Sequence, residues 1–576
     1  MKMIIEPKAG DAEDDASSTK KRSLLAIAGT LLGEINLPKL ALSWIILALV
    51  PAVLLGLAPL VATAWFSTMS DRIVALAGIG PLIILAVLAA ASWYGFRPLL
   101  RAAELSFWSL NSLVVQPGYT LCREGLRHLA ERFLGLETSE DRRARVRAAT
   151  ALGAGLGACA AAAGMALIAW PATRWSGEIA DLAQPLRLVV PALANTLVLM
   201  GAYLAAASLV WGLADATMDQ PRDIVDFDEA PRSARRWRVA HLSDVHAVGE
   251  RYGFRIESGR AGPRGNERFA RVLERLDAIH ANDPLDFVLI TGDMTDAGRS
   301  SEWAEFLEAI AGYPALAQRT FIIPGNHDVN IVDRANPARM ELPASPGKRL
   351  RQMRTLSAMT ALQGDQVRIV DKPKAQLGPS LSQMLQPHAE AIAAFADIGS
   401  RRSSSSLSRL WDDAFPMILP PSEVDGLGLV LLNSNAETNF SFTNALGLVS
   451  EEDMRAVLAI LPQFPGAKWI IALHHHPVEY PMPAKAFSER IGTALINGSR
   501  FVRLLKPLSS RIVAMHGHRH IDWIGRCGQL KIISAPSPVM EATDDEPTGF
   551  YIHTLAPAAD GGLALLKPEH IEIMPG

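Results

Sequence analysis

The pattern of hydrophobic and polar positions divides the chain into two parts. Before about residue 215 it contains four long apolar runs, at 40–66, 73–95, 149–171 and 188–213. Each is close to the roughly 20 residues that a helix needs to cross a bilayer, and the first run carries no charged residue. Uncharged runs of this length are rare in soluble cores. We therefore predict an α-helical transmembrane domain at 37–215 with about four helices, rather than buried helices of a large soluble domain.

The pattern changes after a polar linker at 216–235. Short runs rich in β-branched residues follow, for example Trp237–Leu242, Phe287–Thr291 and Trp469–Leu473, and stretches with helical periodicity lie between them. Near-continuous apolar runs are typical of strands buried on both faces, and strands alternating with helices indicate an α/β fold. We therefore predict an α/β domain at 236–576, with polar loops at the strand ends.

Residues 331–425 interrupt this alternation of strands and helices. The segment is long, contains several prolines and carries a run of four serines at 403–406. Long irregular segments inside a compact domain are usually either functional or flexible. We interpret this one as an insertion, which leaves open a lid or substrate-selecting cap and, equally, a flexible surface excursion.

Composition and charge narrow the class of partner. The 576 residues are 49% hydrophobic, with a mean hydropathy of +0.16 and a net charge of −3. A balance so close to neutral gives no sign of a nucleic-acid partner, and none is expected. Only one of the three cysteines, Cys527, lies in the α/β part, which excludes a disulfide within it.

The distribution of Lys and Arg predicts the orientation in the membrane. Basic residues are frequent in the N-terminal tail at 1–36, between the second and third apolar runs, and after the fourth run. The two opposite loops offer only Arg72, Arg174 and Arg187. Because positive charge stays on the cytoplasmic side, we expect an integral protein of a bacterial-type inner or plasma membrane, with both termini and the α/β domain in the cytoplasm. The start of the chain mixes both charge signs and has no apolar core, so we expect no cleaved signal peptide.

Five short clusters of potential metal ligands lie in the α/β part, most of them directly after an apolar run. In chain order they are Asp244-Val245-His246, Gly292-Asp293-Met294-Thr295-Asp296, Gly325-Asn326-His327-Asp328, His474-His475-His476-Pro477 and Gly517-His518-Arg519-His520. A single histidine of this kind is as often a surface or hydrogen-bonded residue as a ligand. Five clusters in this order predict two metal ions held side by side, a known device of hydrolytic enzymes. Imidazole, amide and carboxylate ligands without thiolate suit Mn, Fe, Zn or Co.

The local spacing suggests how some of these side chains converge. Asp244 and His246 lie two apart, so in extended structure both face the same side and can reach one ion. Gly292 permits a tight exit from the preceding strand, and the carboxylate of Asp293 can then bridge two cations. His327 points away from its neighbour Asn326 and is free for acid–base chemistry.

These clusters resemble the motifs of the calcineurin-like metallophosphoesterase superfamily, D-x-H, G-D-x-x-D, G-N-H-[DE], H and G-H-x-H, which are all present in this order. The resemblance covers about 236–576 and implies a two-sheet β-sandwich flanked by helices. It also implies that Asp244, His246 and His520 hold one metal, that Asn326, His475 and His518 hold the other, that Asp293 bridges them, and that His327 is a proton donor oriented by Asp296. His475 is chosen from its triplet because the family ligand commonly sits two residues before a proline, here Pro477.

The expected function is that of a membrane-anchored dimetal phosphoesterase, which hydrolyses a phosphodiester or phosphomonoester with metal-activated hydroxide. The stretches Asn433–Asn435 and Gly447–Ser450 are similar to the cyclic-nucleotide phosphodiesterase branch, whereas the segment at 331–425 departs from that compact branch. Two alternatives remain. One is a hydrolase of lipid-linked phosphate or pyrophosphate, and the other is a membrane sensor or scaffold whose phosphoesterase domain does not turn over substrate.

Overall fold

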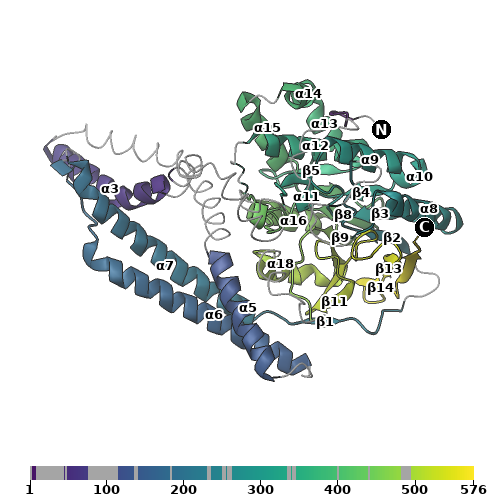
Figure 1. Cartoon of the computed structure of the whole chain (residues 1–576), viewed down its shortest axis with the longest axis horizontal. Helices are drawn as coiled ribbons and strands as arrows, with labels where there is room; N and C mark the ends of the chain where they lie inside the picture. The colour runs from purple at the N-terminus through teal and green to yellow at the C-terminus, as the bar shows by residue number, and fades with distance from the viewer. Residues whose placement is uncertain are drawn as a thin grey trace. The chain divides into compact units, whose positions relative to one another are not determined.

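The computed structural model describes residues 3–7, 45, 49–75, 115–134, 140–178, 180–181, 184–229, 235–249, 255, 262–333, 339, 341, 345–398, 401–438, 441–481 and 495–575. The chain forms two compact units, Ala28–Met218 and a second made of Met1–Ile27 together with Asp219–Gly576. Figure 1 shows long helices in the first unit and sheets with covering helices in the second. The boundary falls within the predicted linker at 216–235.

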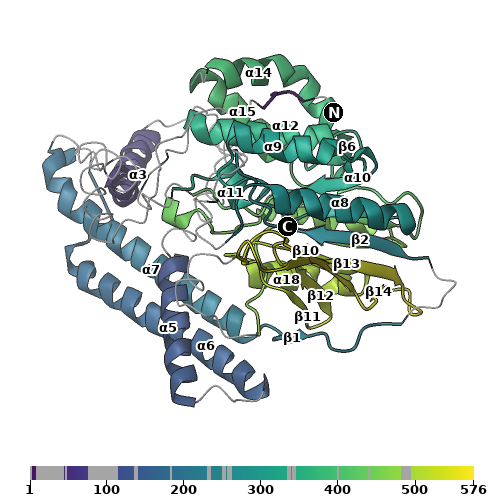
Figure 2. The ribbon, with the colours of Figure 1, turned by 45° about the vertical axis from the view of Figure 1, so that its right-hand side comes forward.

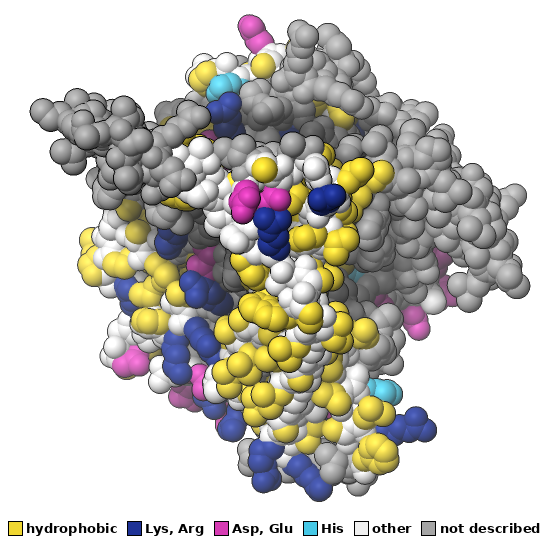
Figure 3. All heavy atoms as spheres, turned by 90° about the vertical axis from the view of Figure 1, so that its left-hand side faces the viewer, with side chains coloured by type: hydrophobic (Ala, Val, Ile, Leu, Met, Phe, Trp, Pro, Cys, Tyr) yellow, Lys and Arg dark blue, Asp and Glu magenta, His cyan; other side chains and the backbone are white. Residues whose placement is uncertain are grey.

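Long helices make up most of the described part of the first unit. They are α3 (Val50–Ala75), α5 (Gln116–Leu134), α6 (Glu140–Ala169) and α7 (Val189–Ala216). Three stretches are long and apolar enough to cross a membrane, Ala52–Met69, Arg142–Ala172 and Pro185–Ala216, and they overlap the predicted spans at 40–66, 149–171 and 188–213. The predicted span at 73–95 lies almost wholly outside the described residues. Figure 3 shows hydrophobic side chains gathered in a broad band on the surface of this unit, as expected for helices in contact with lipid.

Helices α6 and α7 pack against each other through glycines. A Cβ atom on Gly155 of α6 would lie 2.8 Å from the Cα atom of Gly212 in α7, and a Cβ atom on Gly212 would lie 2.8 Å from the Cα atom of Gly155. The two backbones can approach this closely only because neither residue has a side chain, which is a common arrangement in membrane helices. Helix α3 is joined to α7 by Asn195, whose Nδ2 donates to the carbonyl oxygen of Gly56 at 3.1 Å.

Two mixed sheets form the centre of the second unit. Their strands are β1 (Pro221–Asp223), β2 (Trp237–Leu242), β3 (Phe287–Ile290), β4 (Thr320–Ile322), β5 (Arg368–Asp371), β6 (Gln376–Ser380), β7 (Met417–Leu419), β8 (Leu427–Leu431), β9 (Lys468–Ala472), β10 (Ile512–His516), β11 (Trp523–Cys527), β12 (Leu530–Ser534), β13 (Thr548–Pro557), β14 (Leu563–Leu565) and β15 (Glu569–Ile573). The larger sheet has the order β1-β11-β12-β10-β9-β8-β7-β5-β6, and the smaller has the order β14-β13-β2-β3-β4 with β15 paired to β13.

One hydrophobic core is shared by the two sheets. The smaller sheet contributes Val239 and Leu289, and the larger contributes Ile470 and Val513. Helices α8 (Glu267–Asn282), α9 (Ser300–Ala311) and α12 (Pro346–Gln363) add their apolar faces to the same core and lie together beyond the smaller sheet (Figures 1 and 2). Sheets with helices packed on them confirm the predicted α/β class.

In each sheet the parallel strands end on the same side, so that their carboxyl ends lie next to one another. In the smaller sheet β2 runs parallel to β3, and β3 to β4. In the larger sheet β8, β9, β10 and β12 run parallel to one another. Because the carboxyl ends of parallel strands meet at the same edge, loops from distant parts of the sequence come together there.

The described part of the segment at 331–425 is built into the sheet and the core. It supplies β5, β6 and β7 at the edge of the larger sheet, and it supplies α12, which buries Met353, Leu356 and Met359 in the shared core. The Gln363 side chain at the end of α12 accepts a hydrogen bond from the Ile322 N–H at 2.7 Å and donates to the Ile322 carbonyl at 3.1 Å. The Gln363 side chain thereby pairs with the backbone N–H and carbonyl groups of edge strand β4, as a neighbouring strand would.

The start of the chain is docked on the same helix. The backbone N–H groups of Ile4 and Ile5 donate to Ser357 Oγ of α12 at 3.0 and 2.8 Å. Met3, Ile4 and Ile5 also pack, partly buried, against the hydrophobic core. The N-terminal tail is therefore joined at this point to the α/β unit that follows it by more than 200 residues in the sequence.

Candidate metal centre

The predicted ligands lie on loops that leave parallel strands of both sheets. Asp244 and His246 follow β2, Asp293 follows β3, Asn326 follows β4, His474 and His475 follow β9, and His518 and His520 follow β10. The first two loops are joined by backbone hydrogen bonds, from Asp244 N–H to the Gly292 carbonyl (3.0 Å) and from His246 N–H to the Asp293 carbonyl (2.9 Å). His474 Nδ1, which lies 2.7 Å from the Thr291 carbonyl, connects the larger sheet to the smaller.

Five of the predicted ligands have a left-handed backbone conformation. The φ angles are 56° at Asp244, 48° at His246, 52° at Asp293, 75° at His518 and 53° at His520. Such a conformation costs a residue other than glycine about 1–3 kcal/mol, and it persists where the surroundings enforce it, most often at functional sites. Asp244 and His246 thus converge through a strained turn, and not through the extended alternation that their spacing suggested.

Asp293 is the side chain that the potential ligand groups share. Its carboxylate forms one group with His246 and His327 and a second group with His474 and His518; within each group the ligand atoms lie within 4.8 Å of one another. Asp293 Oδ2 lies 3.7 Å from His246 Nε2 and 3.3 Å from His474 Nε2. A carboxylate between two sets of donors has the position of a bridging ligand.

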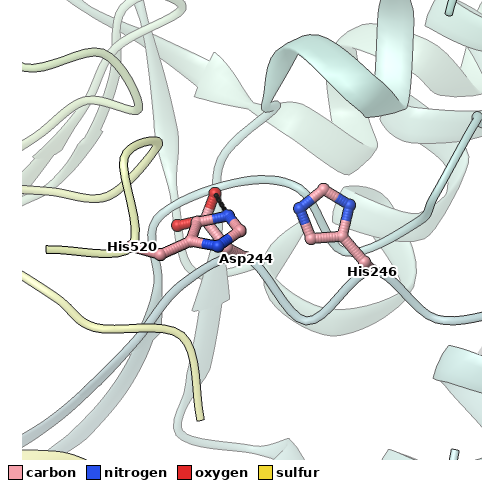
Figure 4. A group of neighbouring side chains, drawn as sticks. All are labelled: Asp244, His246 and His520. Carbon is pink, nitrogen blue, oxygen red and sulfur yellow. Dashed lines mark ion pairs between the residues drawn. The ribbon is translucent and has the colours of Figure 1, made fainter. Parts of the chain in front are cut away.

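Asp244, His246 and His520 form a third group on one side of Asp293. Figure 4 shows Asp244 and His246 on the same loop and His520 reaching Asp244 from another, with the Asp244–His520 ion pair marked. His520 Nε2 lies 3.3 Å from Asp244 Oδ1. This grouping agrees with the set of ligands expected for the first metal.

The group on the other side of Asp293 contains His474 rather than His475. His474 Nε2 lies 3.1 Å from Asn326 Oδ1 and 3.1 Å from His518 Nδ1. His475 is also buried, but its Nδ1 lies 2.9 Å from Ser434 Oγ, and it belongs to none of the three groups among the described residues.

Strand alternation explains why His474 occupies this place. Ile470 and Ala472 of β9 face the core between the sheets, and His474 continues the same face two residues further on. The backbone stays paired to the neighbouring chain up to this point, since Gly517 N–H donates to the His474 carbonyl at 3.1 Å. The sequence already contained this signal, but the distance to Pro477 favoured the next residue.

His327 and Asp296 meet through the backbone. His327 Nδ1 lies 2.7 Å from the main-chain carbonyl of Asp296, whereas the carboxylate of Asp296 lies 3.5 Å from His246 Nδ1. A carbonyl only accepts, so His327 Nδ1 carries the hydrogen and Nε2 is the atom left to exchange a proton. Asp296 thus contacts His327 through its main chain only, and its carboxylate is directed at His246.

Three further residues hold these loops without having been assigned a role. Asp328 accepts hydrogen bonds from the Thr295 N–H (2.9 Å) and hydroxyl (2.7 Å) and from the Gly325 N–H (2.8 Å), so it joins two of the clusters. Ser434 Oγ accepts from the N–H groups of His474 and His475. Glu541 Oε1 lies 3.2 Å from His520 Nδ1, as the outer partner of a metal-binding histidine does.

Two of the three had a signal in the sequence. Asp328 completes the cluster that contains Asn326 and His327, and Ser434 lies in the stretch Asn433–Asn435. Glu541 becomes recognisable only when the fold brings its loop to the site.

The chemistry of the donor set fits two cations. Asp244 Oδ1 and both ring nitrogens of His246 are buried and have no hydrogen-bond partner among the described residues. Buried polar atoms without such partners are costly, and coordination to a cation would satisfy them. Two buried carboxylates, Asp244 and Asp293, lie in the same cluster, so positive charge is needed there.

When no metal is bound, protonated histidine supplies part of the positive charge that the buried carboxylates require. Burial alone lowers the pKa of His474, but the adjacent Asp293 carboxylate outweighs it and raises the pKa to about 9. Burial raises the pKa of Asp293, and the His474 and His327 rings more than offset this and hold it well below the usual range. His474 therefore carries a proton at neutral pH in the metal-free protein.

We predict that His474→Ala and His475→Ala differ in metal content. His474→Ala should lose one of two bound metals, because His474 lies among the candidate ligands, and His475→Ala should keep both. Elemental analysis of the purified full-length variants after Mn²⁺ loading measures this. Loss of a metal from His475→Ala alone would show that His475 is the ligand, as the sequence resemblance implies.

Metal affinity should also depend on pH. Because His474 must lose its proton to bind a metal, we expect the affinity for Mn²⁺ to rise about tenfold between about pH 7 and about pH 8. Calorimetric titration in buffers of different ionisation enthalpy would report the released proton directly. An affinity that does not change with pH, with no proton release, would contradict the protonated state of His474.

Comparison with known proteins agrees with this geometry. Residues 238–372 match the sequence model of a family described as calcineurin-like phosphoesterase. A probable cyclic nucleotide phosphodiesterase of Coxiella burnetii is 29% identical over 103 residues, which are 18% of this chain and 36% of that protein. The match therefore spans little more than a third of the curated relative.

Two solved structures resemble the second unit at low identity. A dimetal phosphatase from Danio rerio is 12% identical, with a TM-score of 0.34, and the match covers 59% of this chain and 99% of that one. The NAD nucleotidase of Haemophilus influenzae is also 12% identical, with a TM-score of 0.30 and coverage of 59% and 57%. The family match is confined to residues 238–372, less than half of the chain, and this stretch contains three of the five clusters of potential metal ligands.

Proposed function

We propose that this protein is a membrane-anchored dimetal phosphoesterase that hydrolyses a phosphodiester or a phosphomonoester. The observation that carries the proposal is the position of Asp293, whose carboxylate belongs to two different potential ligand groups. One group alone would suit a single structural metal. Two groups that share a buried carboxylate are the arrangement required for a pair of cations acting on one phosphate.

In this proposal each cation has its own set of side chains. One is held by Asp244, His246 and His520, the other is held by Asn326, His474 and His518, and Asp293 lies between them. Nitrogen and oxygen donors without thiolate suit Mn, Fe, Zn or Co. When bound, two such cations stabilise negative charge on phosphate oxygens and activate a water molecule as the nucleophile.

The chain's own residues then position the substrate's leaving group. His327 belongs to one of the two potential ligand groups that contain Asp293, so its ring lies beside the proposed metal centre. Its Nδ1 is fixed as a donor to the Asp296 carbonyl, so a protonated Nε2 donates to the leaving oxygen. Asp296 and Asp328 act as positioning residues, because their contacts keep the loops of Asp293 and His327 together.

A phosphodiester is the favoured substrate class, because the curated relative is named a probable cyclic nucleotide phosphodiesterase. The three apolar helices support a second candidate, a lipid-linked phosphate or pyrophosphate whose headgroup lies at the membrane surface. A scaffold without turnover is the least favoured reading, since a non-catalytic domain would be expected to have lost ligands and all of these are present.

The docked N-terminal tail supports the predicted membrane topology. Residues 3–7 contact α12 of the α/β unit, so both must lie on the same side of a membrane. An even number of crossings then separates them. Three candidate spans are described, and the predicted span at 73–95 would supply the fourth. The many basic residues of the tail favour the cytoplasmic side.

Hydrolysis by the full-length protein in nanodiscs with Mn²⁺ tests the proposed activity. We expect turnover of bis(p-nitrophenyl) phosphate that exceeds that of p-nitrophenyl phosphate and is lost in Asp293→Ala. Asp425→Ala, which removes an exposed carboxylate from a loop, is the matched control and should keep full activity.

Each other outcome of this experiment has a clear meaning. Preference for the monoester would make the protein a phosphatase. Turnover of lipid pyrophosphate alone would favour the lipid-linked substrate. Absence of all turnover with two metals bound would contradict an enzymatic role.

Reporter fusions in bacterial cells test the topology. Green fluorescent protein fused to either end should fluoresce, because it folds in the cytoplasm, and alkaline phosphatase fused to either end should be inactive. Alkaline phosphatase fused after residue 178, in the loop between the third and fourth predicted spans, should be active. Reporters that place the two ends on opposite sides would exclude the docked tail.

A further inference from the structure

Arg351 of α12 belongs to the segment at 331–425 and contacts two loops of the site. One loop contains His327, and the other contains Asp296. Arg351 Nε donates to the carbonyl oxygen of Val329, two residues after His327, at 3.2 Å. Its Nη2 forms an ion pair with Glu341, which belongs to the same segment. The Glu341 carboxylate is held in turn by the Ser345 hydroxyl at 3.1 Å.

The aliphatic part of the Arg351 side chain packs against the turn that follows Asp296. Gly298 lies two residues after Asp296 and has a φ of 68°. A Cβ atom at Gly298 would lie 2.6 Å from the carbonyl oxygen of Asp328 and 2.9 Å from Cδ of Arg351. The turn after Asp296 is therefore enclosed between the His327 loop and Arg351, and only glycine fits there.

From these contacts we infer that Arg351, held by Glu341, is a positioning residue that orients His327 for proton donation. The inference rests on the proposed function. Arg351 touches the two loops whose separation sets the 2.7 Å contact between His327 Nδ1 and the Asp296 carbonyl. The segment at 331–425 is thereby part of the catalytic apparatus, and not only a neighbour of the site.

The surroundings of the pair make it rigid. The Arg351 and Glu341 side chains are only 12% and 8% exposed, so removal of either leaves a poorly solvated charge on the other. An arginine is required because its guanidinium group donates to a carbonyl and a carboxylate at the same time, which a lysine cannot do in one plane. Helix α12 is held in place by its core residues and by the hydrogen bond that Gln363 accepts from Ile322 of β4. The position of Arg351 on this helix is therefore well defined.

Substrates with different leaving groups separate positioning of His327 from general stability. Proton donation matters most when the leaving group is poor, so Arg351→Met should impair diphenyl phosphate hydrolysis more than bis(p-nitrophenyl) phosphate hydrolysis. We expect kcat to fall about tenfold for the poorer leaving group, with KM and the two-metal content unchanged. Arg351→Lys should recover only part of the loss. The exposed Arg368 of the same segment provides the control, and Arg368→Met should match the wild type.

Hydrogen–deuterium exchange gives a readout that does not need activity. In Arg351→Met, peptides covering 295–300 and 324–331 should exchange faster than in the wild type, and Arg368→Met should leave them unchanged. If Arg351→Met fails to fold, Glu341→Gln, which keeps the shape of the side chain, should show the same two effects in weaker form.

The outcomes separate this inference from the proposed function. An inactive wild type would reject the proposed function, and exchange in the two loops would still decide whether Arg351 holds them. Equal losses on both diesters, or unchanged exchange in both loops, would overturn the positioning role and reduce Arg351 to a structural residue.

Discussion

The burial of the Asp293 carboxylate at the junction of two sheets is the constraint on which the rest of the structure depends. A buried charge is tolerated only where opposite charge or several donors compensate for it. In the metal-free protein the His474 and His327 rings and the His327 N–H fill that role. The same cluster contains groups that could hold metal ions, and a bound cation would compensate the buried charge of Asp293.

This requirement explains features of the fold that packing alone would not favour. Several ligands accept a left-handed backbone, which is tolerable because neighbouring loops are joined by hydrogen bonds from residues such as Asp328 and Ser434. The next layer outward contains Arg351, which lies on a helix anchored in the core, and its ion-pair partner Glu341, which precedes that helix. Side chains that could touch a phosphate are thus held by residues that cannot reach it. The N-terminal tail also contacts this helix, because Ser357 of α12 accepts hydrogen bonds from the N–H groups of Ile4 and Ile5.

The sequence predicted the α/β class and most of the residues that gather at the site, because the clusters directly follow apolar runs recognisable as strands. Sequence and structure favour different residues within the triplet His474–His476. His475 was favoured by its distance from a proline, whereas the alternation of Ile470 and Ala472 places His474 in the cluster. Asp244 and His246 were expected to converge through extended structure, but a strained turn brings them together.

Other contacts had no signal in the sequence, because they depend on tertiary structure. Glu541 reaches His520 from a loop after β12, and the pairing of Arg351 with Val329 depends on where α12 lies. The integration of residues 331–425 into the larger sheet was likewise hidden, because β5, β6 and β7 are short and helices separate β6 from β7. The long apolar helices were easier to predict, since length and apolar composition are read directly from the sequence. The span at 73–95 stays a prediction, because it lies outside the described residues.

Electron paramagnetic resonance of the full-length protein loaded with Mn²⁺ tests the central claim most directly. Two ions bridged by Asp293 should give the spectrum of an exchange-coupled pair, and Asp293→Ala should abolish the coupling. A spectrum of isolated ions at full occupancy, unchanged by Asp293→Ala, would contradict a dinuclear centre built around this carboxylate.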